Sequence, residues 1–394
     1  MIVAIDTNSI LPGQVGGIEN YTLGLIEALK LPESPARKLL LLTRAENQSL
    51  FAPFADERTD VLLLDRPKRN WADLAKADPD AAGRALAEFQ QSKADLLASR
   101  HVDVIHFPGN TINPLSLDLP IVLNLHDLQH RHFPEYFTAE EIASREKWWV
   151  RSAQRTNSLV AASNFVRDDL VAQLRVDQAK IFVTPDAFQS AFFNRPNPRQ
   201  LADMRRKYNL PATFFIYPAA VWPHKNHRRL IQAFVTAGIA DSQLLLTGGG
   251  QAESDLPKII ADLGASARVR LLGRISTEEL SGLYHLATAL VFPSEFEAWS
   301  IPIMEAMACG CPVTSSNVTS LPEQVGDAGL LFDPTDVAAI AGVMQRLAGD
   351  EELRKMLTKR GHARILEFSP QNFIRSIAEA YEFAVTAYRA KKAA

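Results

Sequence analysis

The sequence has few cysteines and no strong excess of charge of either sign. Its two cysteines, Cys309 and Cys311, have one residue between them. This spacing is too close for an ordinary structural disulfide, and two cysteines are too few for a disulfide framework or a zinc site. Such usage is typical of a reducing cytoplasm. The formal net charge of −3 gives no general attraction to nucleic acid, so we expect no nucleic-acid partner.

The sequence also lacks a long hydrophobic run. Met1 leads directly into an apolar segment without a basic leader, and no run approaches the roughly 20 apolar residues of a membrane span. We therefore expect a cytoplasmic protein, with peripheral contact at the inner face of the membrane left open. Trp148 and Trp149 lie among basic residues in an expected helix over residues 138–155 and are candidates for that contact. Core packing of an ordinary amphipathic helix is the interpretation we favour.

At 394 residues the chain is long for one hydrophobic core, so two domains are expected. Helical patterns alternate with short apolar runs at residues 2–6, 39–42, 61–64, 104–107 and 121–125. This alternation is typical of a doubly wound parallel sheet. A second series of apolar runs that alternate with helical patterns starts at Thr213. Residues 188–200, rich in Pro and Asn, are the expected linker, and residues 66–80 are an expected surface loop.

The chemistry is expected in residues 293–314, PSEFEAWSIPIMEAMACGCPVT. The order of apolar and polar runs here predicts strand, loop, helix and strand. Ser300 suits the N-cap of the helix, Pro302 its first turn, and Gly310 the position just after it. In a parallel sheet such a loop lies beyond the carboxyl end of a strand, where α/β folds bind ligands, and the amides at a helix start favour phosphate.

Two acids flank this helix start. Glu297 and Glu305 have seven residues between them. The two oxygens of a carboxylate can accept a pair of hydroxyls, which is what a ribose or a hexose offers. Phosphate on the amides and hydroxyls on the acids together indicate a nucleotide diphosphate sugar. From spacing alone, the alternative is a solvated helix with surface acids.

The two acids, followed by Ala-Met-Ala-Cys-Gly-x-Pro-Val, closely resemble the signature of the retaining glycosyltransferases of family 4. In that family the second acid, here Glu305, holds the nucleotide ribose, and the first, here Glu297, meets the transferred sugar. The usual Gly-Phe-Gly after the first acid is replaced by a bulkier sequence. The replacing residues are Ala298, Trp299 and Ser300.

The resemblance implies the GT-B fold, with two Rossmann-like parallel-sheet domains facing a cleft and a C-terminal helix that crosses back to the first. We expect an acceptor-side domain at residues 1–190, joined by helix 371–394, and a donor domain at 191–370. The implied activity is a retaining, metal-independent hexosyl transfer without a cofactor. The donor would be GDP-mannose or a UDP-hexose, and the acceptor a glycan or lipid-linked glycan of cell-surface polysaccharide biosynthesis.

Two further side chains are candidates for catalysis. Lys225 precedes an amphipathic helix, where its ammonium group can neutralise a departing diphosphate, although such a lysine is commonly just solvated. It matches the lysine of the family's Gly-Arg-x4-Lys-Asn, but Ala219 and Ala220 stand where Gly and Arg are common. His126 follows the run at 121–125. The resemblance implies that His126 lies near the donor sugar, whereas from the sequence alone it could be a structural histidine.

The remaining donor-site candidates lie in loops after strands. Gly16 and Gly17 open a helix after the first strand, where glycine lets amides approach a ligand closely, and the resemblance implies contact with the donor phosphate. It likewise implies that the main chain near Arg274 and Ile275 meets the base. We add to the donor contacts Gly248, Trp299, Ser300 and Ile301. Turn chemistry alone would also explain the glycines.

Two other functions are weighed against this one. A nicotinamide-dependent Rossmann enzyme would need G-x-G-x-x-G after the first strand and an acid about 20 residues later, but residues 13–17 read GQVGG. A non-catalytic sugar-nucleotide binding protein is favoured only by the absence of the phosphate arginine at Ala220. An assay of donor hydrolysis would separate it from an enzyme.

Overall fold

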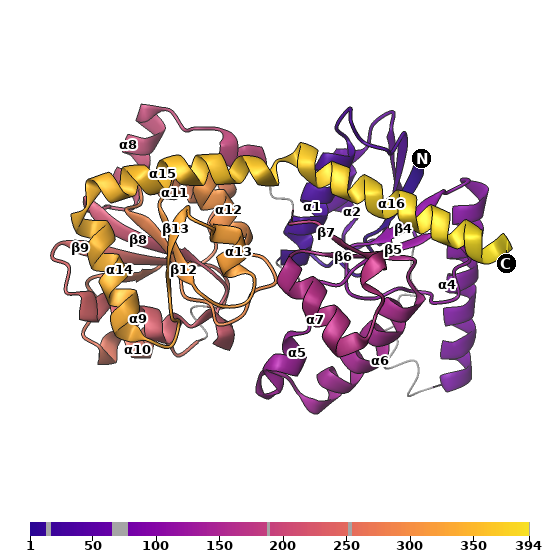
Figure 1. Cartoon of the computed structure of the whole chain (residues 1–394), viewed down its shortest axis with the longest axis horizontal. Helices are drawn as coiled ribbons and strands as arrows, with labels where there is room; N and C mark the ends of the chain where they lie inside the picture. Colours follow the sequence, from indigo (N-terminus) through magenta and orange to yellow (C-terminus); the bar gives the residue numbers. More distant parts are fainter. Residues whose placement is uncertain (13–16, 65–77, 187–189, 251–253, 394) are drawn as a thin grey trace. The chain divides into compact units, whose positions relative to one another are not determined.

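The computed structural model describes residues 1–12, 17–64, 78–186, 190–250 and 254–393. The chain divides into two compact units. The first unit comprises Met1–Ala187 with Pro370–Ala394, and the second is Phe188–Ser369. Each unit is built around a parallel β-sheet flanked by helices (Figure 1), as the alternation of apolar runs and helical patterns predicts.

In the first unit the described residues form a sheet of order β3-β2-β1-β4-β5-β6-β7, parallel throughout. Its strands are β1 (Ile2–Asp6), β2 (Lys38–Thr43), β3 (Thr59–Leu63), β4 (Val104–Phe107), β5 (Ile121–Asn124), β6 (Ser158–Ala161) and β7 (Ile181–Val183). Every residue of β4, β5 and β6 is buried. This explains why these strands are mostly apolar along their length rather than alternating between apolar and polar residues.

The helices of the first unit include α16, which follows the whole second unit in sequence. The described helices are α1 (Gly17–Leu29), α2 (Gln48–Phe51), η1 (Ala52–Phe54), α4 (Pro79–Ser99), α5 (Gln129–His132), η2 (Pro134–Tyr136), α6 (Ala139–Arg155), α7 (Asn164–Leu174), η3 (Gln178–Lys180) and α16 (Pro370–Ala393). Phe373, Ile377 and Tyr381 of α16 are buried in the same core as Val3 and Ile5 of β1. The predicted return of the C-terminal helix to the first domain is therefore confirmed.

The second unit repeats this plan. Its sheet has the order β10-β9-β8-β11-β12-β13 over the described residues. The strands are β8 (Thr213–Pro218), β9 (Ser242–Thr247), β10 (Val269–Leu271), β11 (Ala289–Phe292), β12 (Val313–Ser316) and β13 (Gly329–Phe332). The helices are η4 (Ser190–Phe193), α8 (Pro198–Lys207), η5 (Pro223–Lys225), α9 (His227–Ala237), α10 (Leu256–Asp262), α11 (Thr277–Leu286), α12 (Ile301–Ala308), α13 (Leu321–Val325), α14 (Val337–Gly349), α15 (Glu351–Ile365) and η6 (Leu366–Phe368).

In both sheets the strand order reverses next to the first strand, between β1 and β4 and between β8 and β11. Open α/β sheets bind ligands at the carboxyl ends of the strands beside such a switch point. In the second unit β11 leads into the loop at residues 293–300. The topology thus puts the expected chemistry at the place where this architecture binds ligands.

The expected linker is only partly irregular. Residues 190–193 form η4, and α8 begins at Pro198. The Asn197 side chain caps α8 by accepting the N–H of Gln200, and the Gln200 side chain in turn accepts the N–H of Asn197. Of the residues that indicated a linker, Asn197 and Pro198 are therefore helix-start signals. Of the expected surface loop at 66–80, residues 66–77 lie outside the described part, and α4 starts at Pro79 with Asp78 as N-cap.

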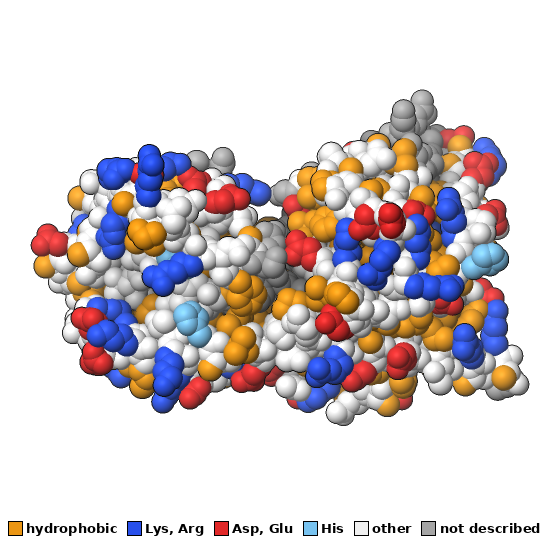
Figure 2. Space-filling model, turned by 90° about the horizontal axis from the view of Figure 1, so that it is seen from above, with side chains coloured by type: hydrophobic (Ala, Val, Ile, Leu, Met, Phe, Trp, Pro, Cys, Tyr) orange, Lys and Arg blue, Asp and Glu red, His pale blue; other side chains and the backbone are white. Residues whose placement is uncertain are grey.

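Surface charge agrees with the near-neutral balance of the sequence. Figure 2 shows Lys and Arg side chains interspersed with Asp and Glu on the face in view. In the described part of the chain, no helix is both long enough and apolar enough to cross a membrane.

Candidate functional site

The loop at residues 293–300 and helix α12 form the centre of the site. Ser300 is the N-cap of α12, and its hydroxyl accepts the N–H of Ile303 at 3.4 Å. Pro302 occupies the first turn, and Gly310 follows the helix with φ of +74°. These local predictions are confirmed. Ile301, as the first helical residue, has no acceptor for its N–H within the helix, so this end of α12 offers a donor to an anion.

Lys225 and Glu297 meet although 72 residues separate them in sequence. The Nζ of Lys225 lies 2.5 Å from Oε1 of Glu297. The two side chains are 20% and 10% exposed, so the pair is partly buried yet open to solvent. The Lys225 ammonium also lies 5.9 Å from the centre of the Phe292 ring, where β11 ends. A cation is thus held at the carboxyl edge of the sheet beside the start of α12.

The turn that carries Lys225 is tied to the loop after β11. Asn226 has φ of +59°, and its amide donates to the carbonyls of Pro293 at 3.0 Å and Pro334 at 2.8 Å. Burial lowers the pKa of His224 to about 3 and that of His227 to about 4, with the charge of Lys225 adding to both shifts. Both imidazoles are therefore neutral near pH 7, and Lys225 supplies the positive charge of the segment 223–227.

Glu305 projects from α12 into a buried position. Its side chain is 7% exposed, and the Tyr284 hydroxyl donates to Oε2 at 3.3 Å. Burial raises the pKa of Glu305 to about 8, an effect that the Tyr284 hydrogen bond only partly opposes. The carboxyl is therefore mostly protonated at neutral pH, and hydroxyl donors would shift it towards the charged form.

Gly248, Gly273 and Arg274 come together beside the loop after β8. The Gly248 N–H donates to the carbonyl of Gly273 at 2.8 Å. A Cβ on Gly248 would lie 2.4 Å from the Ala219 carbonyl oxygen, and a Cβ on Gly249 would lie 3.2 Å from the guanidinium of Arg274. Gly248 also has φ of +135°. Glycine is therefore required at position 248 because the main chain of Ala219 approaches closely. The Arg274 guanidinium lies against Gly249, in the loop after β9.

The other predicted donor contacts differ in exposure. Ile275 is half-buried, whereas Arg274 is exposed. Trp299 is 6% exposed and packs edge-on against Phe368, with ring centres 5.1 Å apart. Among the described residues no acceptor lies near its indole N–H. The Trp299 side chain is therefore largely enclosed by the fold, and its contact with the donor stays a prediction.

His126 and Gly17 belong to the first unit. The Nε2 of His126 lies 2.8 Å from the Pro108 carbonyl, and the main-chain N–H of His126 donates to Oδ1 of Asn110 at 2.9 Å. The His126 ring meets Tyr21 edge-on, at 5.2 Å between centres. At 9% exposed, His126 has one ring nitrogen engaged in the fold, and a role near the donor sugar stays a prediction. Gly17 starts α1, and Gly16 lies outside the described residues.

A chain of buried polar groups runs behind His126. The Tyr21 hydroxyl lies 3.0 Å from Oδ1 of Asn124, which also contacts Nε2 of His106 at 2.6 Å. The other ring nitrogen of His106 lies 2.9 Å from the Tyr381 hydroxyl of α16. Burial lowers the pKa of His106 to about 4, so this chain is neutral and links the sheet to the C-terminal helix.

The two tryptophans of α6 have different surroundings. Trp148 is 41% exposed, with the Lys147 ammonium 5.0 Å from its ring centre. Trp149 is half-buried against the ring of His130. Core packing is therefore wrong for Trp148, because the buried residues of α6 are Ser152 and Ala153. Membrane contact at this helix stays a prediction.

Metal ligands do not gather in the described part of the chain. No group of three or more His, Cys, Asp or Glu side chains there could hold a metal ion. The cysteines are buried thiols, and burial raises the pKa of Cys309 to about 12. Metal independence of the reaction stays a prediction.

Sequence reasoning missed the side chains that support this site. Asn226, Tyr284 and Gln324 make its supporting hydrogen bonds. The position of Asn226 beside Lys225 was a usable signal, because Asn tolerates positive φ before a helix. Tyr284 and Gln324 carry no such local signal, since they are 21 and 24 residues from their partners.

Comparison with known proteins identifies the family. Residues 15–188 match the model of Glycosyltransferase Family 4, and residues 202–364 match Glycosyl transferases group 1. The chain is 32% identical over 285 residues to O-antigen chain mannosyltransferase B of Escherichia coli, covering 71% of this chain and 74% of the relative. It is 28% identical to MMP alpha-(1->4)-mannosyltransferase of Mycolicibacterium hassiacum, over 75% of both chains.

Among solved structures, Anabaena HepE in complex with UDP and glucose superposes with a TM-score of 0.75 at 19% identity. The match covers 96% of this chain and 98% of HepE. This likeness shows the fold, two Rossmann-like units of the GT-B type. Together with the family models and the identity to the Escherichia coli enzyme, it establishes that the chain belongs to glycosyltransferase family 4, the group 1 glycosyl transferases.

Proposed function

We propose that the chain transfers mannose from GDP-mannose to a glycan of a cell-surface polysaccharide, with retention of configuration at the anomeric carbon. The observation that carries the transfer is the Lys225–Glu297 pair, set at the carboxyl edge of the second sheet beside the start of α12. Mannose is favoured over other hexoses because the two sequence relatives described above are named as mannosyltransferases, one of them for an O-antigen chain.

In this proposal the second unit binds the donor. Glu305 accepts the ribose hydroxyls, and the Ile301 amide meets the diphosphate. Lys225 faces the negative charge that grows as the bond between the anomeric carbon and the diphosphate oxygen breaks. Such preorganised charge stabilises the transition state more than the ground state. Glu297 holds Lys225 in place and meets the sugar.

Retention would follow from reaction on one face of the sugar. The acceptor oxygen bonds to the anomeric carbon on the face that the diphosphate leaves. The acceptor proton passes to an oxygen of the departing diphosphate. No covalent bond to a carboxylate is then needed, and charge neutralisation is assigned to Lys225 and the helix-start amide.

The test is a transfer assay with GDP-mannose, UDP-glucose and UDP-galactose on a lipid-linked mannose-containing oligosaccharide, with and without EDTA. We expect transfer from GDP-mannose, unchanged by EDTA, and an α-linked product by NMR. A β-linked product would contradict retention, and transfer only from a UDP-sugar would contradict the donor. Donor binding without transfer or hydrolysis would favour the non-catalytic alternative that Ala220 suggests.

A further inference from the structure

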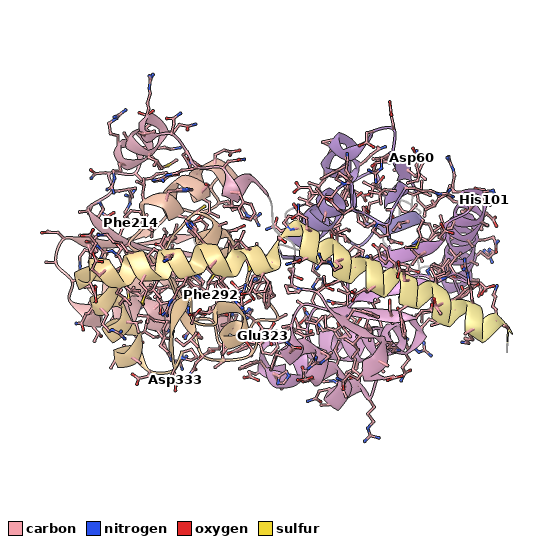
Figure 3. All side chains as sticks on the ribbon, turned by 45° about the horizontal axis from the view of Figure 1, so that its top comes forward. Asp60, His101, Phe214, Phe292, Glu323 and Asp333 are labelled. Atoms are coloured by element: carbon pink, nitrogen blue, oxygen red, sulfur yellow. The ribbon has the colours of Figure 1, made fainter. Side chains whose placement is uncertain are left out.

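The main chain of the loop that carries Glu297 is held by side chains that follow β12. Gln324 of α13 is fully buried. Its Oε1 accepts the N–H of Ser300 at 3.0 Å, and its Nε2 donates to the carbonyl of Ser300 at 2.7 Å. One amide side chain thus satisfies both main-chain groups of the residue that caps α12. Figure 3 labels Phe292, where β11 enters this loop, and Glu323 of α13.

The same segment holds Glu297 in the same way. The N–H of Glu297 donates to the Thr319 hydroxyl at 3.1 Å, and the Ser320 hydroxyl donates to the carbonyl of Glu297 at 2.9 Å. Ser320 is fully buried. Thr319 has φ of +54°, a conformation that is strained for a residue with a Cβ and is retained only where its surroundings enforce it.

Arg364 of α15 supports this segment from behind. Its Nε donates to the carbonyl of Gln324 at 3.2 Å, and it also donates to the carbonyl of Glu323. The Arg364 guanidinium lies 4.9 Å from the centre of the Phe368 ring, and that ring packs on Trp299. The loop is therefore held at the main chain of Glu297 and Ser300 and at the side chain of Trp299.

We propose that Gln324 and Ser320 are positioning residues for sugar transfer, a role that rests on the proposed function. They do not touch the reacting atoms in this proposal. They fix the dihedral angles of the loop, so that the Glu297 carboxylate, its partner Lys225 and the Ile301 amide keep their places. A displacement of about 1 Å in a catalytic group can lower a rate about 100-fold. The four hydrogen bonds that hold the main chain of Glu297 and Ser300, which we call the clamp, should therefore affect the rate.

The principal variant is Gln324→Met, which removes both amide hydrogen bonds at nearly constant volume. We expect kcat to fall about 10- to 100-fold with little change in KM for the donor, because the loss concerns the geometry of the transition state. Gln345→Met is the matched control. Gln345 also donates its amide to a main-chain carbonyl, that of Ala237 at 2.9 Å, and its replacement should leave kcat unchanged.

A double-mutant cycle separates positioning from general stability. If Gln324 acts through Glu297, Gln324→Met should cause little further loss of kcat in a Glu297→Gln background, since coupled residues are non-additive. An equal loss in both backgrounds, or near-native kcat in Gln324→Met, would overturn the inference. If Gln324→Met does not fold, Ser320→Ala takes its place in the same cycle with the same criteria.

Hydrogen exchange tests the clamp without relying on activity. The amides of Glu297 and Ser300 should be protected in the wild-type protein. Gln324→Met should exchange faster at Ser300, whereas Gln345→Met should not. A wild-type protein that transfers no sugar would refute the proposed function alone, while unchanged exchange in Gln324→Met would refute the clamp alone.

Discussion

Two lysine–carboxylate pairs occupy corresponding places in the two units and differ in their surroundings. Asp6 ends β1 and pairs with Lys93 of α4, whereas Lys225 follows β8 and pairs with Glu297. The strands β1 and β8 hold the same position in their sheets. In the first pair the side chains are 0% (lysine) and 5% (aspartate) exposed, whereas in the second they are 20% (lysine) and 10% (glutamate) exposed.

The first pair is enclosed by the fold. Lys93 also donates to the Asn113 carbonyl at 2.7 Å, and its ammonium lies 5.5 Å and 5.6 Å from the ring centres of Phe89 and Phe107. A buried ion pair is costly to break, because removing one partner leaves the other charge buried without compensation. Solvent reaches the second pair, so its ammonium can exchange a carboxylate for a phosphate at lower cost. A lysine–carboxylate pair thus serves structure in one unit and, as we propose, chemistry in the other.

The largest expected effect is on the enclosed pair. Lys93→Met should destabilise the protein by about 3–5 kcal/mol, because it leaves the buried Asp6 carboxylate uncompensated. Urea unfolding measures this loss. Lys38→Met is the control, since Lys38 pairs with Asp60 at 2.6 Å but is 31% exposed, and exposed pairs contribute about 0–1 kcal/mol. Equal losses in the two variants would remove the distinction between the pairs.

The accessible pair should affect rate more than stability. We expect Lys225→Met to lower kcat by roughly two to three orders of magnitude, as when one preorganised donor is deleted, with a smaller loss of stability than in Lys93→Met. Steady-state kinetics on GDP-mannose gives kcat and KM separately. Arg228→Met is the control, because Arg228 is 60% exposed and pairs with an exposed Asp255.

Introducing the arginine that the family commonly has at position 220 gives a second test of the role of Lys225. In a Lys225→Met background, Ala220→Arg should recover part of the lost rate if either cation can meet the same phosphate. A Lys225→Met variant whose only defect is a raised KM would place Lys225 in ground-state binding instead.

Glu305 is a buried acid with a hydroxyl partner rather than a cation. Its pKa is raised from 4.5 to about 8 by burial, so the folded state keeps a proton that the unfolded state releases, and stability falls as pH rises from 4.5 to about 8. Glu305→Gln cannot ionise and should be more stable than the wild type at about pH 8, by on the order of 3 kcal/mol, but not at about pH 4. Urea midpoints at the two pH values measure the difference, and an equal difference at both would contradict the raised pKa.

The smallest expected effect is on nucleotide affinity. If ribose hydroxyls donate to the ionised Glu305, binding releases a proton, and affinity should rise by up to about 1.4 kcal/mol per pH unit towards the pKa of about 8. Calorimetry with GDP between pH 6 and pH 8 measures this slope. In Glu305→Gln the slope should vanish. A wild-type affinity independent of pH would place the ribose elsewhere.

Local signals predicted the secondary structure around the site well. The cap at Ser300, the proline in the first turn of α12 and Gly310 after it depend on neighbouring residues alone, and each lies where expected. The linker was predicted too long, because Asn197 and Pro198 suit a helix start as well as a loop, although the second unit does begin at its first residue, Phe188. The exposure of Trp148 was misjudged because periodicity does not say which face of a helix finds a neighbour.

By itself, the sequence determined the two parallel sheets, the helix that starts after the loop at residues 293–300 and, through resemblance, the family. These depend on the order of apolar runs and on short motifs. Only the tertiary structure decided that Lys225 pairs with Glu297, that Gln324 holds Ser300 and that burial raises the pKa of Glu305. Each of these depends on contacts between segments far apart in sequence, and both the desolvation of a charge and the partner of a hydrogen bond are set by what folding brings near.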